Sequence, residues 1–391
     1  MKLSPLTFYS LAAVFEIAGS SGAATLAPFF MKAHGYSITA ASVPLFVNGL
    51  GRVCSDLSSG ILASYFSSGV LIVAATVTAI AVSAAANYFL EFTGVLLGAF
   101  TLLGITEAMF ALSIRKIAFE QSEPGKQGKA QGQVAAALGI GFAAGPLIGG
   151  FAGRAFGPQA LFAVYALPQV AGLILLLLGG AHRSRAVTQE SSVQLWHEGK
   201  KLLSQFWFLA SALAIFQSFS MLVGVTRIAF PFLAVNQRGF GLDWVGTMVS
   251  ISRMTDTVGR YTGGRLCDWI TAPRVILLGV GIGIPMFILE PYGTGAPSLV
   301  LPLMIMTMGF GYSNVSATTF ALQSAGANAK ALALGLTRAS SSLGNGLGPL
   351  IAGALVQALG YETGFHAMAA LSAAVFLVAW VGLKRNAGGN K

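Results

Sequence analysis

The sequence predicts an all-α polytopic membrane protein in which twelve transmembrane helices form two pseudo-symmetric six-helix bundles. Two observations lead to this fold class. Hydrophobic residues make up 55% of the 391 residues and charged residues only 9%, whereas about a quarter of a typical soluble domain is charged. A pattern of glycine and proline in the first half of the chain also recurs in the second half, which indicates a duplicated structure.

Apolar runs along the chain define the expected helices. A hydrocarbon core about 30 Å thick takes about 20 helical residues to cross. Runs of that length lie near residues 6–30, 40–63, 70–90, 93–114, 131–153, 158–181, 204–234, 243–265, 273–290, 297–322, 332–356 and 363–383. We expect the first run to remain as a helix rather than to be cleaved as a secretory signal, because Glu16 interrupts its apolar core.

The duplication is carried by six positions in each half. The first copy consists of Gly132, Gly141, Gly145, Pro146, Gly149 and Gly150, and it returns 203 residues later as Gly335, Gly344, Gly348, Pro349, Ala352 and Gly353. Small residues let transmembrane helices approach closely, and proline bends a helix. We therefore expect a bent, closely packed helix in each half, with Gly145 and Gly348 at equivalent positions facing the seam between the bundles.

The longest polar stretch, residues 182–201, lies at the midpoint of the chain. We interpret residues 182–203 as a cytoplasmic linker between an N-terminal bundle, residues 1–181, and a C-terminal bundle, residues 204–391. With the N-terminus placed inside, fifteen of the 23 lysines and arginines fall on the cytoplasmic side and three outside. By the positive-inside rule, both termini are expected to be cytoplasmic.

The composition also limits the chemistry that the protein is expected to perform. The net charge of +10 follows from this membrane topology, so it does not indicate a nucleic-acid partner. Cys54 and Cys267 are the only cysteines, and the four histidines show no ligand spacing. We therefore expect neither a disulfide framework nor a metal or other cofactor.

Two halves of six helices, a central cytoplasmic loop and the glycine and proline pattern on helices 5 and 11 together resemble the major facilitator superfamily of secondary transporters. The pattern from Gly132 to Gly150 is similar to the signature of drug/proton antiporters in that family. A second family motif, Gly-x-Leu-x-Asp followed by a basic residue, lies between helices 8 and 9 at Gly264, Asp268 and Arg274. Its counterpart in the first half has Ser64 in place of the aspartate, and Phe100 occupies the position of the arginine usual on helix 4.

Charged residues within the expected helices are the candidate binding residues. Each ionisable side chain at the bilayer centre costs at least about 2.5–3.5 kcal/mol, so it needs a partner or a polar cavity. Two such pairs stand at i, i+4 on the faces of helices 2 and 8, with their signs exchanged: Arg52 with Asp56, and Asp256 with Arg260. The further candidates are Glu16, Glu107, Arg253, Asn314 and Arg338. Mutual neutralisation within each pair is the alternative to a role in transport.

Two of these side chains are assigned specific roles. Glu16 lies near the middle of helix 1 without a basic residue within a turn, so we expect it to carry the coupled proton, with Glu107 or Asp56 in reserve. A purely structural, hydrogen-bonded Glu16 or Glu107 is the alternative. Arg260, oriented by Asp256, is expected to face the central cavity and to bind substrate.

The sequence thus predicts a proton-coupled secondary transporter that moves a small organic solute across a bacterial inner membrane by alternating access. The antiporter-like pattern favours a monomeric exporter whose partners are its small-molecule substrate, protons and the lipid bilayer. The alternative is a symporter or uniporter for a small carboxylate or other organic anion, because Asp256 and Arg260 resemble the pair of monocarboxylate-type members. More remote alternatives are a channel and an intramembrane enzyme with Ser313 as nucleophile and His366 as base.

Overall fold

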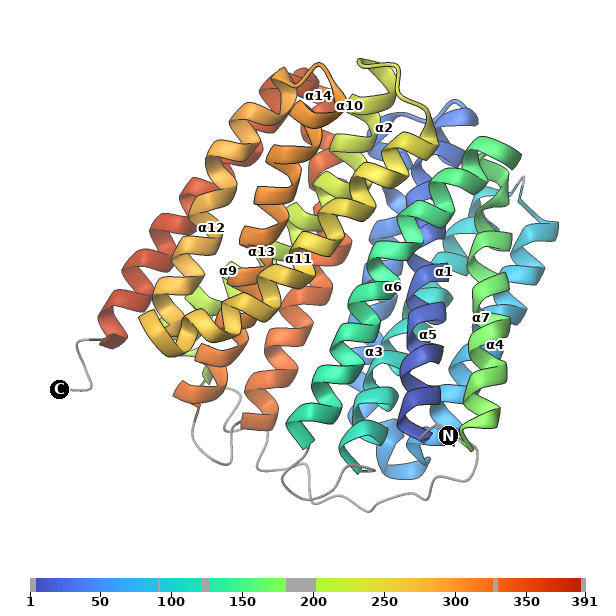
Figure 1. Cartoon of the computed structure of the whole chain (residues 1–391), viewed down its shortest axis with the longest axis horizontal. Helices are drawn as coiled ribbons and strands as arrows, with labels where there is room; N and C mark the ends of the chain where they lie inside the picture. The colour runs from blue at the N-terminus through green and yellow to red at the C-terminus, as the bar shows by residue number, and fades with distance from the viewer. Residues whose placement is uncertain (1–4, 91, 121–126, 181–201, 326–329, 388–391) are drawn as a thin grey trace. The chain divides into compact units, whose positions relative to one another are not determined.

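The chain is all-helical throughout the part that the computed structural model describes, which comprises residues 5–90, 92–120, 127–180, 202–325 and 330–387 (Figure 1). Nine of the described helices are long and apolar enough to cross a membrane. The expected all-α class is therefore confirmed. Most of the expected linker, residues 181–201, lies outside the described residues.

Two compact units make up the chain, and the first contains most of the N-terminal half. Its helices are α1 (Pro5–Ala33), α3 (Val43–Tyr65), α4 (Ser68–Tyr88), α5 (Thr93–Glu120), α6 (Gln127–Phe156), the short turn η1 (Pro158–Ala160) and α7 (Leu161–Leu178). In Figure 1, α1 lies between α6 and α7, and it contacts both. Within its apolar window α1 is 83% buried, which makes it the central helix of this unit.

The second unit contains most of the C-terminal half. Its elements are α9 (Phe206–Gly224), the π-helical turn η3 (Val225–Ala229), α10 (Phe230–Asn236), α11 (Leu242–Ile270), α12 (Ala272–Leu289), η4 (Glu290–Tyr292), α13 (Ala296–Ser324) and α14 (Lys330–Ala387). The last two expected helices both lie on α14, where Gly360 has φ +78° and interrupts the helical backbone. Each apolar run expected from the sequence overlaps a helix of the structure.

The glycines of the first copy bring the backbones of α1 and α6 into contact. A Cβ placed on Gly141 would lie 2.8 Å from the carbonyl oxygen of Val14, and one on Gly145 would lie 2.8 Å from that of Ala18. The contact is reciprocal, because a Cβ on Gly22 would lie 2.9 Å from the carbonyl oxygen of Gly145. No side chain fits at these positions without displacing a helix.

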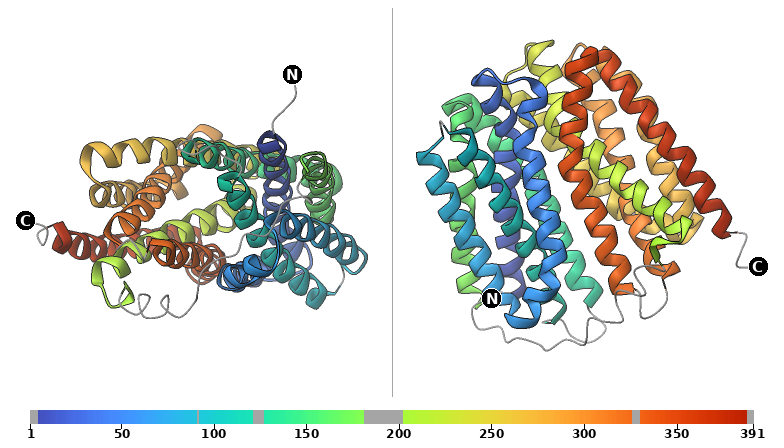
Figure 2. Two further views of the ribbon diagram at one scale, coloured as in Figure 1. Left: turned by 90° about the horizontal axis from the view of Figure 1, so that it is seen from below. Right: turned by 180° about the vertical axis from the view of Figure 1, so that it is seen from behind.

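The second copy packs in the same way against α9, which Figure 2 shows beside α14. A Cβ on Gly344 would lie 2.5 Å from the carbonyl oxygen of Phe216, and a Cβ on Gly348 would overlap the backbone of Ser220. Gly224 meets the carbonyl oxygen of Gly348 as Gly22 meets that of Gly145. The duplication inferred from the sequence is therefore visible as the same helix contact in both units.

This packing corrects one detail of the sequence interpretation. Gly145 and Gly348 do occupy equivalent positions, but each packs directly against the backbone of the first long helix of its own unit, which is α1 for Gly145 and α9 for Gly348. They do not face a seam between bundles as expected. The physical reason is that a missing side chain is needed where two helix backbones cross, and the crossings are inside the units.

Two short segments are exchanged between the halves of the chain. Residues 240–250, at the start of α11, belong to the first unit, and residues 37–42, which contain α2 (Ile38–Ala41), belong to the second. In the first unit, a Cβ on Gly150 would lie 2.5 Å from the carbonyl oxygen of Leu242. In the second, a Cβ on Gly353 would lie 3.2 Å from that of Ile38. These equivalent contacts show that the duplication extends to the exchanged segments.

Polar contacts fasten both exchanged segments. Asp243 pairs with Arg154 at the end of α6, and the Ser250 hydroxyl donates to the carbonyl oxygen of Ala143 over 2.6 Å. In the second unit the backbone N–H of Ile38 donates to Oε1 of Gln357 over 3.0 Å. Each segment is thus held by hydrogen bonds as well as by close packing.

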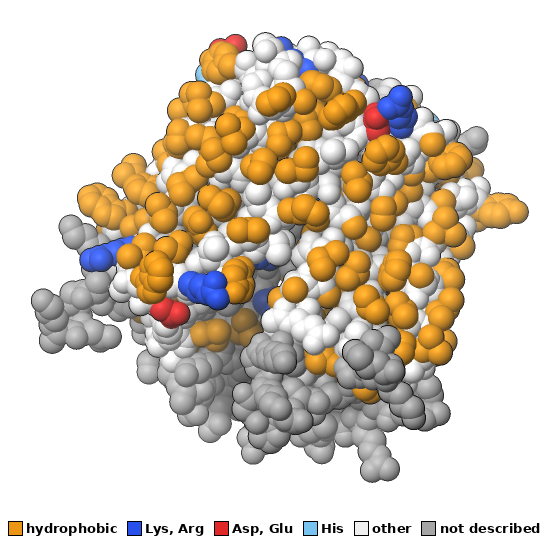
Figure 3. Space-filling model, in the orientation of Figure 1, with side chains coloured by type: hydrophobic (Ala, Val, Ile, Leu, Met, Phe, Trp, Pro, Cys, Tyr) orange, Lys and Arg blue, Asp and Glu red, His pale blue; other side chains and the backbone are white. Residues whose placement is uncertain are grey.

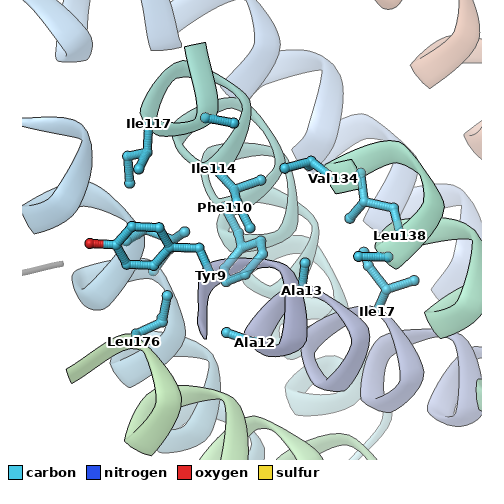
Figure 4. Close-up of a cluster of buried hydrophobic side chains, with 14 residues drawn as sticks. Tyr9, Ala12, Ala13, Ile17, Phe110, Ile114, Ile117, Val134, Leu138 and Leu176 are labelled. Atoms are coloured by element: carbon cyan, nitrogen blue, oxygen red, sulfur yellow. The ribbon is translucent and has the colours of Figure 1, made fainter. Parts of the chain in front are cut away.

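An apolar cluster fills the interior of the first unit near the start of α1 (Figure 4). The Tyr9 ring takes part in it, while its hydroxyl donates to the carbonyl oxygen of Gly179 over 2.8 Å and satisfies the end of α7. On the outside, apolar side chains are spread over the whole described surface in the view of Figure 3, and few charged side chains are visible among them. Exposed Leu167 and Trp269 exemplify the surface expected to face lipid.

We expect Gly145→Ala to lower the midpoint of thermal unfolding, because the new Cβ would meet Ser21 at 2.5 Å and overpacking of this kind costs about 1–3 kcal/mol. Gly132→Ala is the matched control within the same pattern, since nothing lies within 4 Å of its Cβ position. Thermal denaturation of the purified protein in detergent measures both midpoints. Equal midpoints for the two variants would contradict the packing role of Gly145.

Candidate ion-coupling and substrate-binding sites

The first unit holds two deeply buried carboxyl groups. Glu16 on α1 is 1% exposed, and neither of its carboxyl oxygens has a hydrogen-bond partner. Glu107 on α5 is 5% exposed and close enough to act electrostatically on Glu16. The low-dielectric interior penalises a carboxylate that has no partner. Glu16 is therefore a group whose charge a proton would neutralise.

An arginine from a third helix pairs with Glu107. Nη1 of Arg52 on α3 lies 3.2 Å from Oε2 of Glu107. The structure thus gives Arg52 an ion pair across to α5, a partner that its predicted pairing with Asp56 on α3 did not include. The pair removes the net charge at Glu107, so the negative charge that is left among these three groups is that of Glu16.

Two polar residues near these carboxyl groups were missed in the sequence interpretation. Tyr165 and Gln169 on α7 are 2% and 0% exposed. Tyr165 lies within electrostatic reach of both Glu107 and Glu16. The available signal was a tyrosine and a glutamine one turn apart in an otherwise apolar helix, LFAVYALPQVAGLILLLL. Neither side chain carries a formal charge at neutral pH, so the cost of burying a charge does not single them out in the sequence.

In the second unit, Asp256 and Arg260 on α11 form a bidentate ion pair. Nε of Arg260 lies 3.1 Å from Oδ1 of Asp256, and Nη2 lies 2.9 Å from Oδ2. The Arg260 guanidinium also lies over the Phe219 ring, 5.7 Å from its centroid. Asp256 is buried, while a third of the Arg260 side chain remains exposed. The carboxylate thus orients the guanidinium and leaves part of it accessible to a ligand.

The ion pair between α3 and α5 is not repeated in the second unit. The position 204 residues after Glu107 is Gly311, so the second unit has no carboxylate there. A Cβ on Gly311 would lie 2.5 Å from the carbonyl oxygen of Asp256, because α13 packs directly on the backbone of α11. The Arg52–Glu107 pair therefore has no counterpart between α11 and α13, because the positions equivalent to its two members are Asp256 and Gly311.

Arg253 lies at the centre of a cationic group in the second unit. It is 4% exposed, its Nη2 donates to the Thr226 hydroxyl over 2.7 Å, and its Nε has no hydrogen-bond partner. Arg227 and Arg260 both lie close enough to act on its charge. Arg227 and Thr226 belong to the π-helical turn η3, a geometry that is frequent at functional sites. Arg253 thus lies within electrostatic reach of two further arginines and of the Asp256 carboxylate.

The remaining candidates are on α13, α14 and the loop after α11. Asn314 on α13 and Arg338 on α14 are half-buried. Gly264 and Asp268 lie near the end of α11, and Arg274 lies at the start of α12, where Asp268 and Arg274 are exposed. This loop motif is therefore located away from the buried arginines along the helix.

Comparison with known proteins identifies the family. The profile of the Major Facilitator Superfamily matches residues 9–340. The chain belongs to the major facilitator superfamily. It is accordingly a transporter rather than an enzyme, and its fold is that of the family. No curated protein matches the chain by sequence.

Three solved structures illustrate the likeness in fold. The nucleoside transporter NupG has a TM-score of 0.75 at 16% identity, with 98% of this chain and 100% of NupG covered. A bacterial homologue of the human lysosomal transporter Spinster, in an inward-facing and unoccupied conformation, has a TM-score of 0.77 at 14% identity over 97% of each chain. The human organic anion transporter MFSD10 has a TM-score of 0.70 at 13% identity, with 96% and 98% covered.

Removing Arg52 alone should destabilise the protein more than removing both members of its ion pair. Arg52→Met leaves the buried Glu107 without its cation, a change that costs about 3–5 kcal/mol for a buried pair. The double variant Arg52→Met, Glu107→Gln should recover most of the loss. Thermal denaturation of the single and double variants in detergent measures the difference. A double variant no more stable than Arg52→Met would show that Glu107 does not depend on this partner.

Proposed function

We propose that this chain is a proton-coupled secondary transporter whose substrate is a small organic anion. The observation that carries the proposal is the environment of Arg253 in the second unit. Arg253 is 4% exposed, Arg227 and Arg260 act on its charge, and the Asp256 carboxylate near it is already bound by Arg260. Buried cations are costly to retain for packing alone. A carboxylate or similar anion would supply the missing negative charge.

Arg253 is the residue best suited to bind that anion. Its hydrogen-bond partner in the structure is a neutral hydroxyl, that of Thr226, and its Nε is not engaged. Arginine presents a planar fork of donors that matches a carboxylate in a bidentate manner. Arg260, already held by Asp256, would add positive potential and a partly exposed edge.

Glu16 is the group that we propose for proton coupling. It is a buried carboxyl with no hydrogen-bond partner, and the neighbouring Glu107 is already neutralised by Arg52. Gaining and losing a proton therefore changes the net charge of the first unit by one. Coupling arises if the conformations of the transporter differ in the access that Glu16 has to water.

Proton-linked export is the second candidate. It is supported by the antiporter-like pattern, whose Gly141 and Gly145 pack directly on α1, the helix that carries Glu16. Whichever direction holds, we propose a monomer in a bacterial inner membrane with both termini in the cytoplasm, and halves that correspond to residues 1–181 and 204–391 joined by the linker 182–203. The asymmetry of the lysines and arginines supports this orientation.

Arg253→Ala should reduce the uptake of small monocarboxylates into proteoliposomes by at least about tenfold, because a charge-assisted hydrogen bond contributes about 1.5–3 kcal/mol. Arg253→Lys, which keeps the charge but not the fork, should retain part of the activity. Arg265→Ala is the control on the same helix, since Arg265 is exposed and stacks on Tyr261. A panel of amphipathic cations is tested in parallel. The anion proposal would be rejected if the protein transports cations and the Arg253→Ala variant transports them as fast as the unmodified protein.

Glu16→Gln should abolish transport driven by a pH gradient, while exchange of substrate down its own gradient survives. The amide keeps the shape of the carboxyl group but cannot release a proton. Glu290→Gln is the matched control, because Glu290 is also fully buried with both carboxyl oxygens unpartnered, but lies in the second unit. Proteoliposomes with an imposed pH gradient measure both modes. A normal response to the gradient in Glu16→Gln would place the coupling site elsewhere.

A further inference from the structure

Buried polar side chains of α7 lie near Glu16 of α1. Helices α1 and α7 run against each other and touch at two points. A Cβ on Gly19 would lie 2.5 Å from the carbonyl oxygen of Tyr165, and a Cβ on Gly172 would lie 3.3 Å from that of Ala12. Glu16 lies between these points on α1, as Gln169 does on α7. The two crossings therefore place Glu16 and Gln169 at the same level of the helix pair.

Five polar atoms in this interior have no hydrogen-bond partner. They are both carboxyl oxygens of Glu16, the hydroxyl oxygen of Tyr165, and Oε1 and Nε2 of Gln169. Gln169 lies beside the Tyr165 hydroxyl, but without the geometry of a hydrogen bond. Roughly 90% or more of buried polar groups are satisfied in proteins, and isolated exceptions are costly. Three unsatisfied side chains in one place indicate a function rather than packing.

A proline adds a backbone acceptor to the same interior. Pro168 lies inside α7 and has no N–H, so the carbonyl group of Val164 lacks its usual helical donor. This carbonyl oxygen lies on the side of α1, 3.5 Å from the Cβ position of Gly19. Donors and acceptors are therefore both present around Glu16.

We propose that Gln169 and Tyr165 are positioning residues that hold Glu16 in both of its protonation states. The carboxylic acid donates its O–H to Oε1 of Gln169, and the carboxylate accepts hydrogen bonds from Nε2 of Gln169 and from the Tyr165 hydroxyl. One proton binds one carboxyl oxygen and later returns to water. The inference rests on the proposed role of Glu16 as the proton carrier.

The choice of residue types supports this assignment. An amide has both a donor and an acceptor, so rotation of one side chain can serve a carboxylic acid and a carboxylate in turn. A phenol is a good donor to a carboxylate. The other charged groups that face the site are Glu107 from α5 and its partner Arg52 from α3, while α6 presents Gly141 and Gly145 to α1. Because the Arg52–Glu107 pair carries no net charge, we expect the protonation of Glu16 to depend on Tyr165 and Gln169.

The experiment follows the carboxylic-acid C=O band of Glu16 by infrared spectroscopy of the full-length protein in liposomes as the pH is varied. Glu16→Gln identifies the band. In Tyr165→Phe, the pH at half-conversion should rise by about one unit, because the lost hydroxyl stabilises only the carboxylate. Gln169→Leu should shift the band to higher frequency, since the acid loses its acceptor. Gln217→Leu is the control, because Gln217 is a buried glutamine of the second unit that donates to Ser372.

An unchanged half-conversion pH in Tyr165→Phe together with an unchanged band frequency in Gln169→Leu would overturn the inference. Tyr165→Phe keeps the ring and its packing, so the test remains available if Gln169→Leu does not fold. The outcome is separable from that of the proposed function. A band that responds to both variants supports the inference even if Glu16→Gln still transports along a pH gradient, and that transport would reject only the coupling role.

Discussion

The whole arrangement depends on backbone-to-backbone contact between the first long helix of each unit and the glycine-rich helix that crosses it. In a bilayer the lipid tails are as apolar as the side chains, so the hydrophobic effect does not drive helices together. Close packing and interhelical hydrogen bonds must do so. At Gly145 and Gly348 the approach is close enough that even a methyl group would displace a helix. The position of α1, and with it that of Glu16, follows from this contact.

The same scaffold carries different charges in its two units. In the first, Arg52 and Glu107 neutralise each other across α3 and α5, and Glu16 is left as an acid without a cation. In the second, α11 carries Asp256 and Arg260 paired on one helix, with Arg253 one turn before them. The positions equivalent to Arg52 and Glu107 are Asp256 and Gly311, so the second unit does not repeat the first unit's ion pair. The two units thus share the same helix crossings but differ in the charged residues that they bury.

This divergence is the basis for assigning separate tasks to the units. A group that exchanges a proton is best isolated from permanent charges, because a neighbouring arginine would hold a carboxylate in its ionised form. Glu16 meets that condition among the described residues, since its carboxyl oxygens have no hydrogen-bond partner and Arg52 is engaged by Glu107. A group that binds an anion needs the opposite environment. Arg253, close to Arg227 and Arg260, has it.

The sequence alone determined the membrane environment, the helical class, the duplication and the family. These follow from composition, from runs of about 20 apolar residues and from glycine spacing, all of which are local or periodic properties of the chain. It also singled out Glu16, Arg253 and Arg260, because charges within apolar runs are conspicuous. Only the tertiary structure decided which groups meet: Arg52 with Glu107, Gly145 with α1, and Tyr165 within electrostatic reach of Glu16. Contacts between helices depend on the crossing angle and rotation of each helix, and no spacing within a single helix records these.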